Sequence, residues 1–147
     1  MKECVGLMLA RTLYAQLAGR AERGTAVGEE LNTLALLLDA GDGCTEDRRG
    51  AMKYLEAAAE RGHEVAVVTM AMVAEEAKCE TSRAWYKRGA ALGNAQAQCW
   101  IGKELVAGGD YAGGRRMLEE ARDGGDEEAA VALCCIPRTK ADEGRHE

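Results

Sequence analysis

The chain of 147 residues is poor in aromatic residues and in proline. Aromatic residues make up 4% of it, phenylalanine is absent, and Pro137 is the single proline. Folds rich in β-structure place proline in many of their turns, so this scarcity disfavours them. With few aromatic side chains, alanine and leucine must fill the core, which is typical of helices that approach one another closely. The apolar content of 47% excludes an intrinsically disordered chain.

Long apolar runs and histidines are also scarce. No apolar run reaches the roughly 18 residues that a transmembrane helix needs. The chain has two histidines, His63 and His146, which leaves little material for a hydrolytic triad. His63 occupies a position that Asn94 and Asp126 fill elsewhere in the chain, and this predicts a polar helix cap. No Gly-Lys-Ser/Thr follows the glycine pairs, so a phosphate-binding loop is not indicated. We therefore predict no enzyme, no catalytic residue and no cofactor.

The charge is acidic and unevenly spread. A net charge of −6 argues against a nucleic-acid binder, which would carry a basic stripe. Residues 1–24 carry +2, residues 29–62 carry −4 and residues 126–147 carry −3. One interpretation is that these acidic segments attract a basic partner. The alternative is that they form a solvated surface whose charge keeps the protein soluble.

The six cysteines follow no metal-binding or disulfide pattern. They are Cys4, Cys44, Cys79, Cys99, Cys134 and Cys135. None forms a Cys-x-x-Cys pair or a Cys/His spacing that suits zinc, so we predict no metal site. Cys134 and Cys135 are adjacent, which disfavours a bridge between them because their Cβ atoms diverge. The favoured interpretation is reduced, mostly buried thiols in an intracellular protein.

A short phrase occurs three times along the chain. It reads Ala-Ala-Glu-Arg-Gly-His at 58–63, Gly-Ala-Ala-Leu-Gly-Asn at 89–94 and Ala-Arg-Asp-Gly-Gly-Asp at 121–126. The fifth residue of each phrase is a glycine, and these glycines are 31 and 32 residues apart. Self-similarity at such a period indicates a solenoid, in which each unit buries its apolar face against its neighbours.

Further columns appear when the units are aligned on these glycines. Small and bulky residues alternate in the columns, which hold Ala66, Ala97 and Ala129; Met70, Ile101 and Leu133; Ala71, Gly102 and Cys134; Tyr54, Trp85 and Met117; and Ala51, Ser82 and Gly114. Small residues let two helices approach closely, and bulky ones fill the space between helix pairs. The glycine ends the second helix in a left-handed conformation, and an Asn or Asp after it caps the next helix.

The first unit carries the fullest pattern. It contains Leu34-Ala35, Leu38, Gly41-Asp42-Gly43-Cys44, Asp47, Ala51, Tyr54-Leu55, Ala58-Ala59 and Gly62. The second unit adds Trp85-Tyr86 and Gly93-Asn94-Ala95, and the third adds Ile101-Gly102 and Asp110. This pattern resembles the SEL1-like repeat, and the resemblance covers residues 29–136. Tetratricopeptide repeats are the near relative, with a period of about 34.

Some positions depart from the family pattern. The second and third units lack the Gly-x-Gly-Val loop, and Lys78 stands where the second unit should have the loop aspartate. Family members with one disulfide per repeat place a cysteine where Ala59, Ala90 and Arg122 stand here. That bridge pattern, and the drug binding reported with it, are therefore not expected.

The resemblance implies an all-α fold, a right-handed α/α superhelical solenoid of about three helix-turn-helix repeats. We expect an N-terminal capping helix in residues 1–28, the solenoid in 29–136 and a flexible charged tail in 137–147. The first and last helices should cap the apolar ends of the stack. Helices are predicted at 2–23, 29–40, 47–61, 64–76, 80–92, 95–107, 111–123 and 126–136.

First helices line the concave surface of SEL1-like and related solenoids, so the resemblance also suggests a binding groove. The helical step of 100° turns one face of each first helix away from the core. The predicted partner-binding residues on this face are Leu36, Thr69, Met72, Glu76, Trp100 and Lys103. The alternative is that they pack against neighbouring repeats or the N-terminal helix.

The function predicted from the sequence is a non-catalytic scaffold or adaptor for a protein partner. One alternative is a permanent subunit of a larger assembly, a mitochondrial one included. Another is a small redox or metal protein that uses Cys79 or the Cys134-Cys135 pair. We expect a cytoplasmic or mitochondrial location, no nucleic-acid partner and no membrane span.

Overall fold

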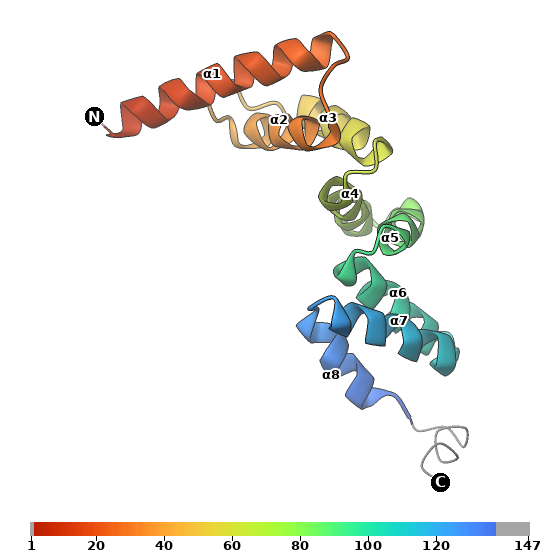
Figure 1. Ribbon diagram of the computed structural model, residues 1–147. Coiled ribbons are helices and arrows are strands. Elements are labelled where there is room, and N and C mark those ends of the chain that lie inside the picture. Colours follow the sequence, from red (N-terminus) through yellow and green to blue (C-terminus); the bar gives the residue numbers. More distant parts are fainter. Residues whose placement is uncertain (1, 138–147) are drawn as a thin grey trace. The chain divides into compact units, whose positions relative to one another are not determined.

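The computed structural model describes residues 2–137. Within this part of the chain the regular structure is helical throughout: α1 (Lys2–Glu22), α2 (Gly28–Ala40), α3 (Arg48–Glu60), α4 (Glu64–Glu76), α5 (Thr81–Ala91), α6 (Ala95–Ala107), α7 (Tyr111–Asp123) and α8 (Glu127–Cys135) (Figure 1). The predicted all-α fold is confirmed, and every helix end falls within one residue of its predicted place. Apart from Pro137, the tail predicted at 137–147 lies outside the described residues. None of the described helices is long and apolar enough to cross a membrane.

The chain divides into two compact units, Met1–Ser82 and Arg83–Glu147. The boundary falls in the first turn of α5, inside the stretch predicted as one solenoid. Each unit has its own buried core. In the first unit the core comes from α2, α3 and α4, and its fully covered members are Leu34, Ala58, Ala59, Ala66, Val67 and Ala71. In the second unit it comes from α6, α7 and α8, with Cys99, Leu118, Ala121, Ala129 and Ile136.

The turns between repeats have the predicted left-handed glycines. The φ angles of Gly62, Gly93 and Gly125 are 78°, 88° and 95°, a region that side-chain-bearing residues rarely adopt. After two of them a side chain caps the next helix. The Asn94 carboxamide oxygen accepts the Ala97 N–H at 2.9 Å, and the Asp126 carboxylate accepts the Ala129 N–H at 2.8 Å.

The polar cap predicted at His63 is wrong. His63 occupies the N-cap position of α4, but its side chain accepts no hydrogen bond from the helix. The base of this side chain lies beside the start of α2, since the His63 Cβ is 3.0 Å and its Cγ 3.7 Å from where a Cβ of residue 28 would stand.

Helices α6 and α7 cross with their backbones nearly in contact. A Cβ on Gly102 would lie 2.7 Å from Leu118 Cγ and 3.1 Å from the Gly114 carbonyl oxygen. A Cβ on Gly114 would lie 2.9 Å from the Gly102 carbonyl oxygen. Both glycines are buried, as the small-residue columns predict. Close approach of this helix pair thus depends on two positions without side chains.

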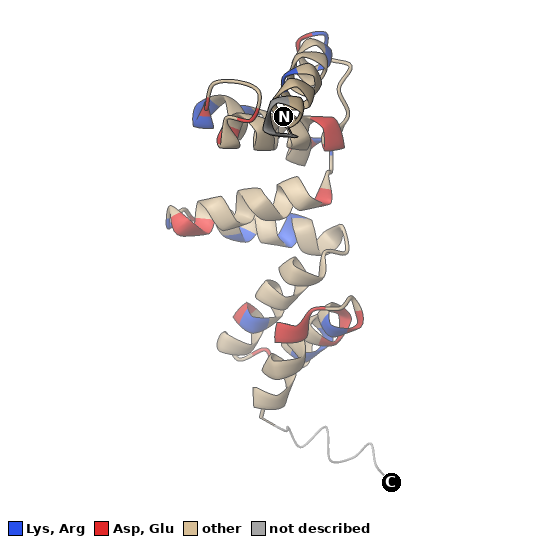
Figure 2. Ribbon diagram, turned by 90° about the vertical axis from the view of Figure 1, so that its left-hand side faces the viewer, with Lys and Arg blue, Asp and Glu red and all other residues tan. Residues whose placement is uncertain are grey.

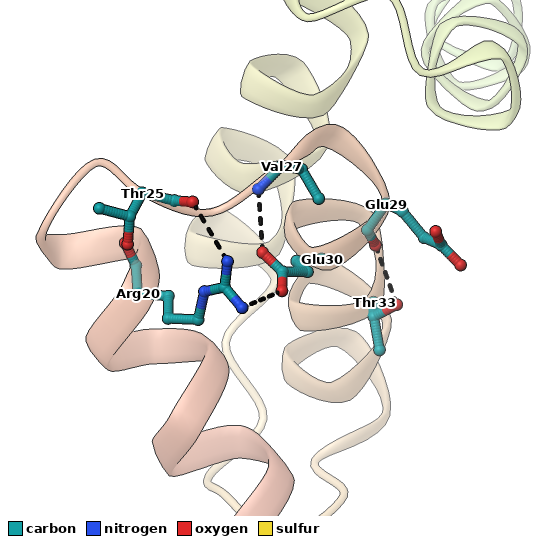
Figure 3. A network of polar contacts seen from close by, with 6 residues as sticks. All are labelled: Arg20, Thr25, Val27, Glu29, Glu30 and Thr33. Atoms are coloured by element: carbon teal, nitrogen blue, oxygen red, sulfur yellow. Dashed lines mark hydrogen bonds and ion pairs between the residues drawn. The ribbon is translucent and has the colours of Figure 1, made fainter.

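Helix α1 is tied to α2 by a polar network at the corner between them (Figure 3). Arg20 pairs with the Glu30 carboxylate at 2.7 Å, and Glu30 also accepts the Val27 N–H at 2.9 Å. The Arg20 guanidinium reaches the Thr25 carbonyl oxygen at 3.5 Å. One carboxylate therefore both caps the start of α2 and holds the end of α1.

The second attachment of α1 is the loop between α2 and α3. Gly43 in this loop has φ +73°, and a Cβ there would overlap the backbone of Ala10 and Arg11. Toward the C-terminal end of α1 the Leu17 side chain is buried. Helix α1 thus contacts the rest of the first unit through the α2–α3 loop near Ala10 and Arg11 and, nearer its C-terminal end, through the corner with α2.

Candidate binding groove

A groove of about 460 Å³ lies in the first unit, between α2, α3 and α4. Its apolar lining comes from all three helices and includes Ala35, Leu36, Ala51, Met52, Leu55 and Val65. Ala35, Ala51 and Leu55 also belong to the buried core. Leu36 and Val65 remain 60% and 55% exposed, so they present apolar surface to the solvent. The groove therefore has a buried inner surface and two accessible aliphatic side chains.

Charged side chains stand along the same groove. Asp39, Arg48 and Glu76 are part of its lining. The Arg48 Nε lies 3.8 Å from the Asp39 carboxylate and 3.3 Å from the Glu46 carboxylate. These exposed pairs contribute little stability in water, but they hold the Arg48 side chain between two carboxylates. The result is an apolar centre with polar residues around it, which is the usual anatomy of a protein interface.

Three of the six predicted partner-binding residues lie in this groove. They are Leu36 on α2, and Thr69 and Glu76 on α4. Met72 lies on α4 and is 42% exposed, but it is not among the residues that line the groove. Trp100 and Lys103 belong to α6 in the second unit.

Both predicted residues of α6 have partners inside the second unit. The Trp100 ring stacks on the Tyr86 ring of α5, with centroids 4.3 Å apart and an angle of 11° between the planes. The Lys103 ammonium donates to the Glu128 carboxylate at 2.6 Å, and this hydrogen bond raises the pKa of Lys103. One face of the Trp100 indole is thus covered by a residue of the neighbouring helix α5, which agrees with the alternative that the predicted groove residues pack against neighbouring repeats.

The groove residues that sequence reasoning missed come from all three helices, and those of the second helix α3 were not expected at all. Arg48, Ala51, Met52 and Leu55 line the groove, whereas we expected only first helices to do so. Ala51 belongs to a repeat column of small residues that indicates core, and Leu55 follows Tyr54 in the pattern of the first unit. The sequence does not distinguish a core residue at the bottom of a groove from one that is fully enclosed. Arg48 follows Asp47, whose side chain caps α3 by accepting the Gly50 N–H at 3.0 Å.

Two comparisons find no counterpart for this chain: no protein-family model matches it, and no curated protein matches it. Solved structures do match. A Sel1 repeat protein from Oxalobacter formigenes superposes with a TM-score of 0.71 at 28% identity, over 82% of this chain and 96% of that one. This chain has a SEL1-like repeat fold.

A second solved structure with the SEL1-like fold is a protective antigen present in uropathogenic Escherichia coli strains. It superposes with a TM-score of 0.64 at 21% identity and covers 84% of this chain. This chain spans 27% of the antigen's length, so the likeness concerns the repeat fold. The resemblance derived from the glycine, alanine and Trp-Tyr columns is therefore confirmed.

The cysteines of these SEL1-like repeats are less buried than predicted. Cys99 is buried, Cys44 is half-buried, and Cys79, Cys134 and Cys135 are exposed. All five are free thiols. The expectation of mostly buried thiols is wrong because Cys79 lies in the turn before α5, and the other two exposed cysteines lie on the outer face of α8. Within residues 2–137 no three His, Cys, Asp or Glu residues gather in a way that could hold a metal ion.

Burial of Cys99 predicts a loss of stability at alkaline pH. Desolvation, with the nearby Asp126 charge, raises the pKa of the Cys99 thiol from 9.0 to about 11. Between these values the unfolded chain releases a proton that the folded chain retains, so stability falls as pH rises from 9 toward 11. Denaturant unfolding at several pH values should show a shallower alkaline fall for Cys99→Val. A Cys134→Ala control, at an exposed position, should retain the fall of the unmodified chain; equal slopes for all three would contradict this interpretation.

Proposed function

We propose that this protein is a non-catalytic scaffold or adaptor that binds a segment of another protein in the groove between α2, α3 and α4. The observation that supports this most directly is the pairing of exposed Leu36 and Val65 with a buried apolar lining in one concave site. Its volume of about 460 Å³ is within the usual range of small binding sites.

The lining also suggests the chemistry of the bound segment. Aliphatic side chains of a partner would contact Leu36, Val65 and Met52, where burial of apolar area supplies most of the affinity. Asp39 and Glu76 would accept hydrogen bonds or an ion pair from a basic residue beside them. A short apolar segment that carries a lysine or arginine at its edge fits both features.

Site-specific photo-cross-linking in cells tests this function. A photoreactive residue at position 36 or 69 should cross-link to the same partner peptide, identified by mass spectrometry. The matched control is position 53, because Lys53 is exposed on α3 and does not line the groove. Cross-links that are equally frequent at position 53 would contradict the proposal.

The purified partner segment then gives a quantitative prediction. Leu36→Glu should weaken its binding at least about tenfold, since it removes a central apolar contact and places a charge in the groove. Leu36 is exposed, so the melting temperature should stay unchanged. Lys53→Glu, a control outside the groove, should bind within about twofold of the unmodified chain. Unchanged affinity of Leu36→Glu would show that the segment binds elsewhere.

A further inference from the structure

The groove between α2, α3 and α4 has two different ends. At one end the starts of α2 and α4 meet, because a Cβ on Gly28 would lie 3.0 Å from the Cβ of His63, the N-cap residue of α4. From there both helices run along the groove, and their last lining residues are Asp39 of α2 and Glu76 of α4. The other end of each groove wall therefore carries a carboxylate.

These two carboxylates differ in their surroundings. Asp39 already has a counter-charge, since the Arg48 Nε lies 3.8 Å from its carboxylate. Glu76 has no hydrogen-bond or ion-pair partner among the described residues. The C-terminal end of a helix carries partial negative charge, so a carboxylate in the last turn of α4 is unfavourable until a cation binds to it. Glu76 is therefore the carboxylate at which a cation from another molecule gains most.

The rest of the α4 wall is uncharged. Between Glu64 in its first turn and Glu75 near its end, α4 has no charged residue; in Figure 2 this helix is red at its two ends and tan between them. Val65 and Val73 line the groove in this stretch. A bound segment thus meets aliphatic surface along most of α4 and a single unpaired carboxylate at its end.

The uncharged polar side chains of the lining are Asn32 and Thr69. The Thr69 hydroxyl donates to the Val65 carbonyl oxygen at 2.8 Å, so its donor is used within α4. The Asn32 carboxamide is half-buried and has no hydrogen-bond partner among the described residues. A segment that covers this carboxamide must supply hydrogen bonds, because a buried amide without partners is costly. The backbone of an extended segment has free N–H and C=O groups for this, whereas a helix uses its own internally.

The length of the groove also suits a short extended segment. The lining runs from Asn32 to Asp39 on α2, a length of about 10 Å, and from Val65 to Glu76 on α4, about 16 Å. An extended chain advances about 3.3 Å per residue, so three to five residues cover these distances. Its side chains alternate between two sides, so residues two positions apart face the groove together.

We propose that the groove binds its segment in an extended conformation, with the segment backbone hydrogen-bonded to the Asn32 carboxamide and a lysine or arginine paired with Glu76. This inference rests on the proposed function, since it specifies how the same groove holds its partner. Aliphatic side chains at alternate positions contact Leu36 and Val65. The basic residue lies three to five positions from the residue at Asn32. Glu76 then determines the preference for a cation, and Asn32 determines the preference for an extended backbone.

Selection from a phage-displayed library of random octapeptides on the full chain tests this pattern. Enriched peptides should carry aliphatic residues two positions apart and a lysine or arginine near one end. Selection on Glu76→Gln should enrich the same aliphatic pattern without the basic residue. Glu56→Gln is the matched control, because Glu56 is exposed on α3 and does not line the groove; it should retain the basic residue.

Fluorescence polarisation with the consensus octapeptide then measures each contact. Norleucine in place of the basic residue should weaken binding about fivefold to the unmodified chain and to Asp39→Asn, but less than about twofold to Glu76→Gln. N-methylation of the peptide amide that lies at Asn32 should weaken binding about fivefold, and this loss should disappear with Asn32→Ala. Melting temperatures of the variants show that each is folded.

The results that would overturn this inference differ from those that would overturn the groove function. If Leu36→Glu abolishes binding but the enriched peptides have aliphatic residues three and four positions apart, the groove binds a helix and the extended conformation is wrong. An equal preference for lysine or arginine on Glu76→Gln would show that another carboxylate holds the cation. If no peptide is enriched, or Leu36→Glu binds the enriched peptides unchanged, the groove function itself fails and this inference fails with it.

Discussion

Gly114→Ala is expected to destabilise the second unit by about 2–3 kcal/mol. At most helical positions the same change stabilises a protein by roughly 0.5–1 kcal/mol, because alanine has the better helix propensity. At Gly114 the added methyl would lie 2.5 Å from Val106 Cγ2 and 2.9 Å from the Gly102 carbonyl oxygen. A backbone oxygen cannot move aside as a flexible side chain can, so the helices α6 and α7 must separate.

Tryptophan fluorescence during urea unfolding measures this effect. Trp85 and Trp100 both belong to Arg83–Glu147, so their signal reports the second unit. The control is Gly108→Ala, because Gly108 has a right-handed backbone and a Cβ there would meet its nearest atom at 3.5 Å. That variant should be neutral or slightly more stable. If Gly114→Ala is as stable as Gly108→Ala, the two helices do not approach as described.

Gly43→Ala should destabilise the first unit by about 2–5 kcal/mol, from two separate causes. The φ of +73° costs a side-chain-bearing residue roughly 1–2 kcal/mol. The added methyl would also overlap the backbone of Ala10 and Arg11 in α1, which adds a packing cost of about 1–3 kcal/mol. The expected structural consequence is that the α2–α3 loop and α1 move apart.

The control for Gly43→Ala isolates the second cause. Gly62 has a similar φ of 78°, but a Cβ at this position would have no atom within 4 Å of it. Gly62→Ala should therefore lose only the stability that the positive φ costs an alanine. The difference in unfolding free energy between Gly43→Ala and Gly62→Ala then measures the cost of the overlap with α1. Hydrogen exchange should become faster in α1 for Gly43→Ala alone. Equal destabilisation with unchanged exchange in α1 would contradict the contact.

Gly43 also explains a difference between the loops of the repeats. Only the first repeat carries the complete Gly-x-Gly loop, and its second glycine is the one that contacts α1. In the third repeat Asp110 follows Gly109 directly and caps α7 by accepting the Gly113 N–H at 2.9 Å. A shorter turn is enough where no additional helix rests on the loop.

The sequence by itself determined the local structure of this protein. Left-handed glycines end helices, Asn94 and Asp126 cap the helices that follow, and small residues mark close helix crossings. Each of these features depends on a few residues that the sequence shows directly. Such effects repeat with the period of the chain, so the helix bounds and the SEL1-like fold were predicted correctly. The predicted cap at His63 failed: its side chain accepts no hydrogen bond from α4, and the base of that side chain lies beside Gly28, 35 positions earlier in the chain.

Only the tertiary structure decided which faces are covered. Leu36 and Lys103 occupy equivalent repeat positions, yet Leu36 lines an open groove and Lys103 is paired with Glu128 of α8. Cys99 and Val131 are equivalent too, and one is buried while the other is exposed. A repeat pattern gives equivalent positions the same prediction, whereas their exposure depends on the helix that packs beside each one. The candidate groove arises from those differences in packing.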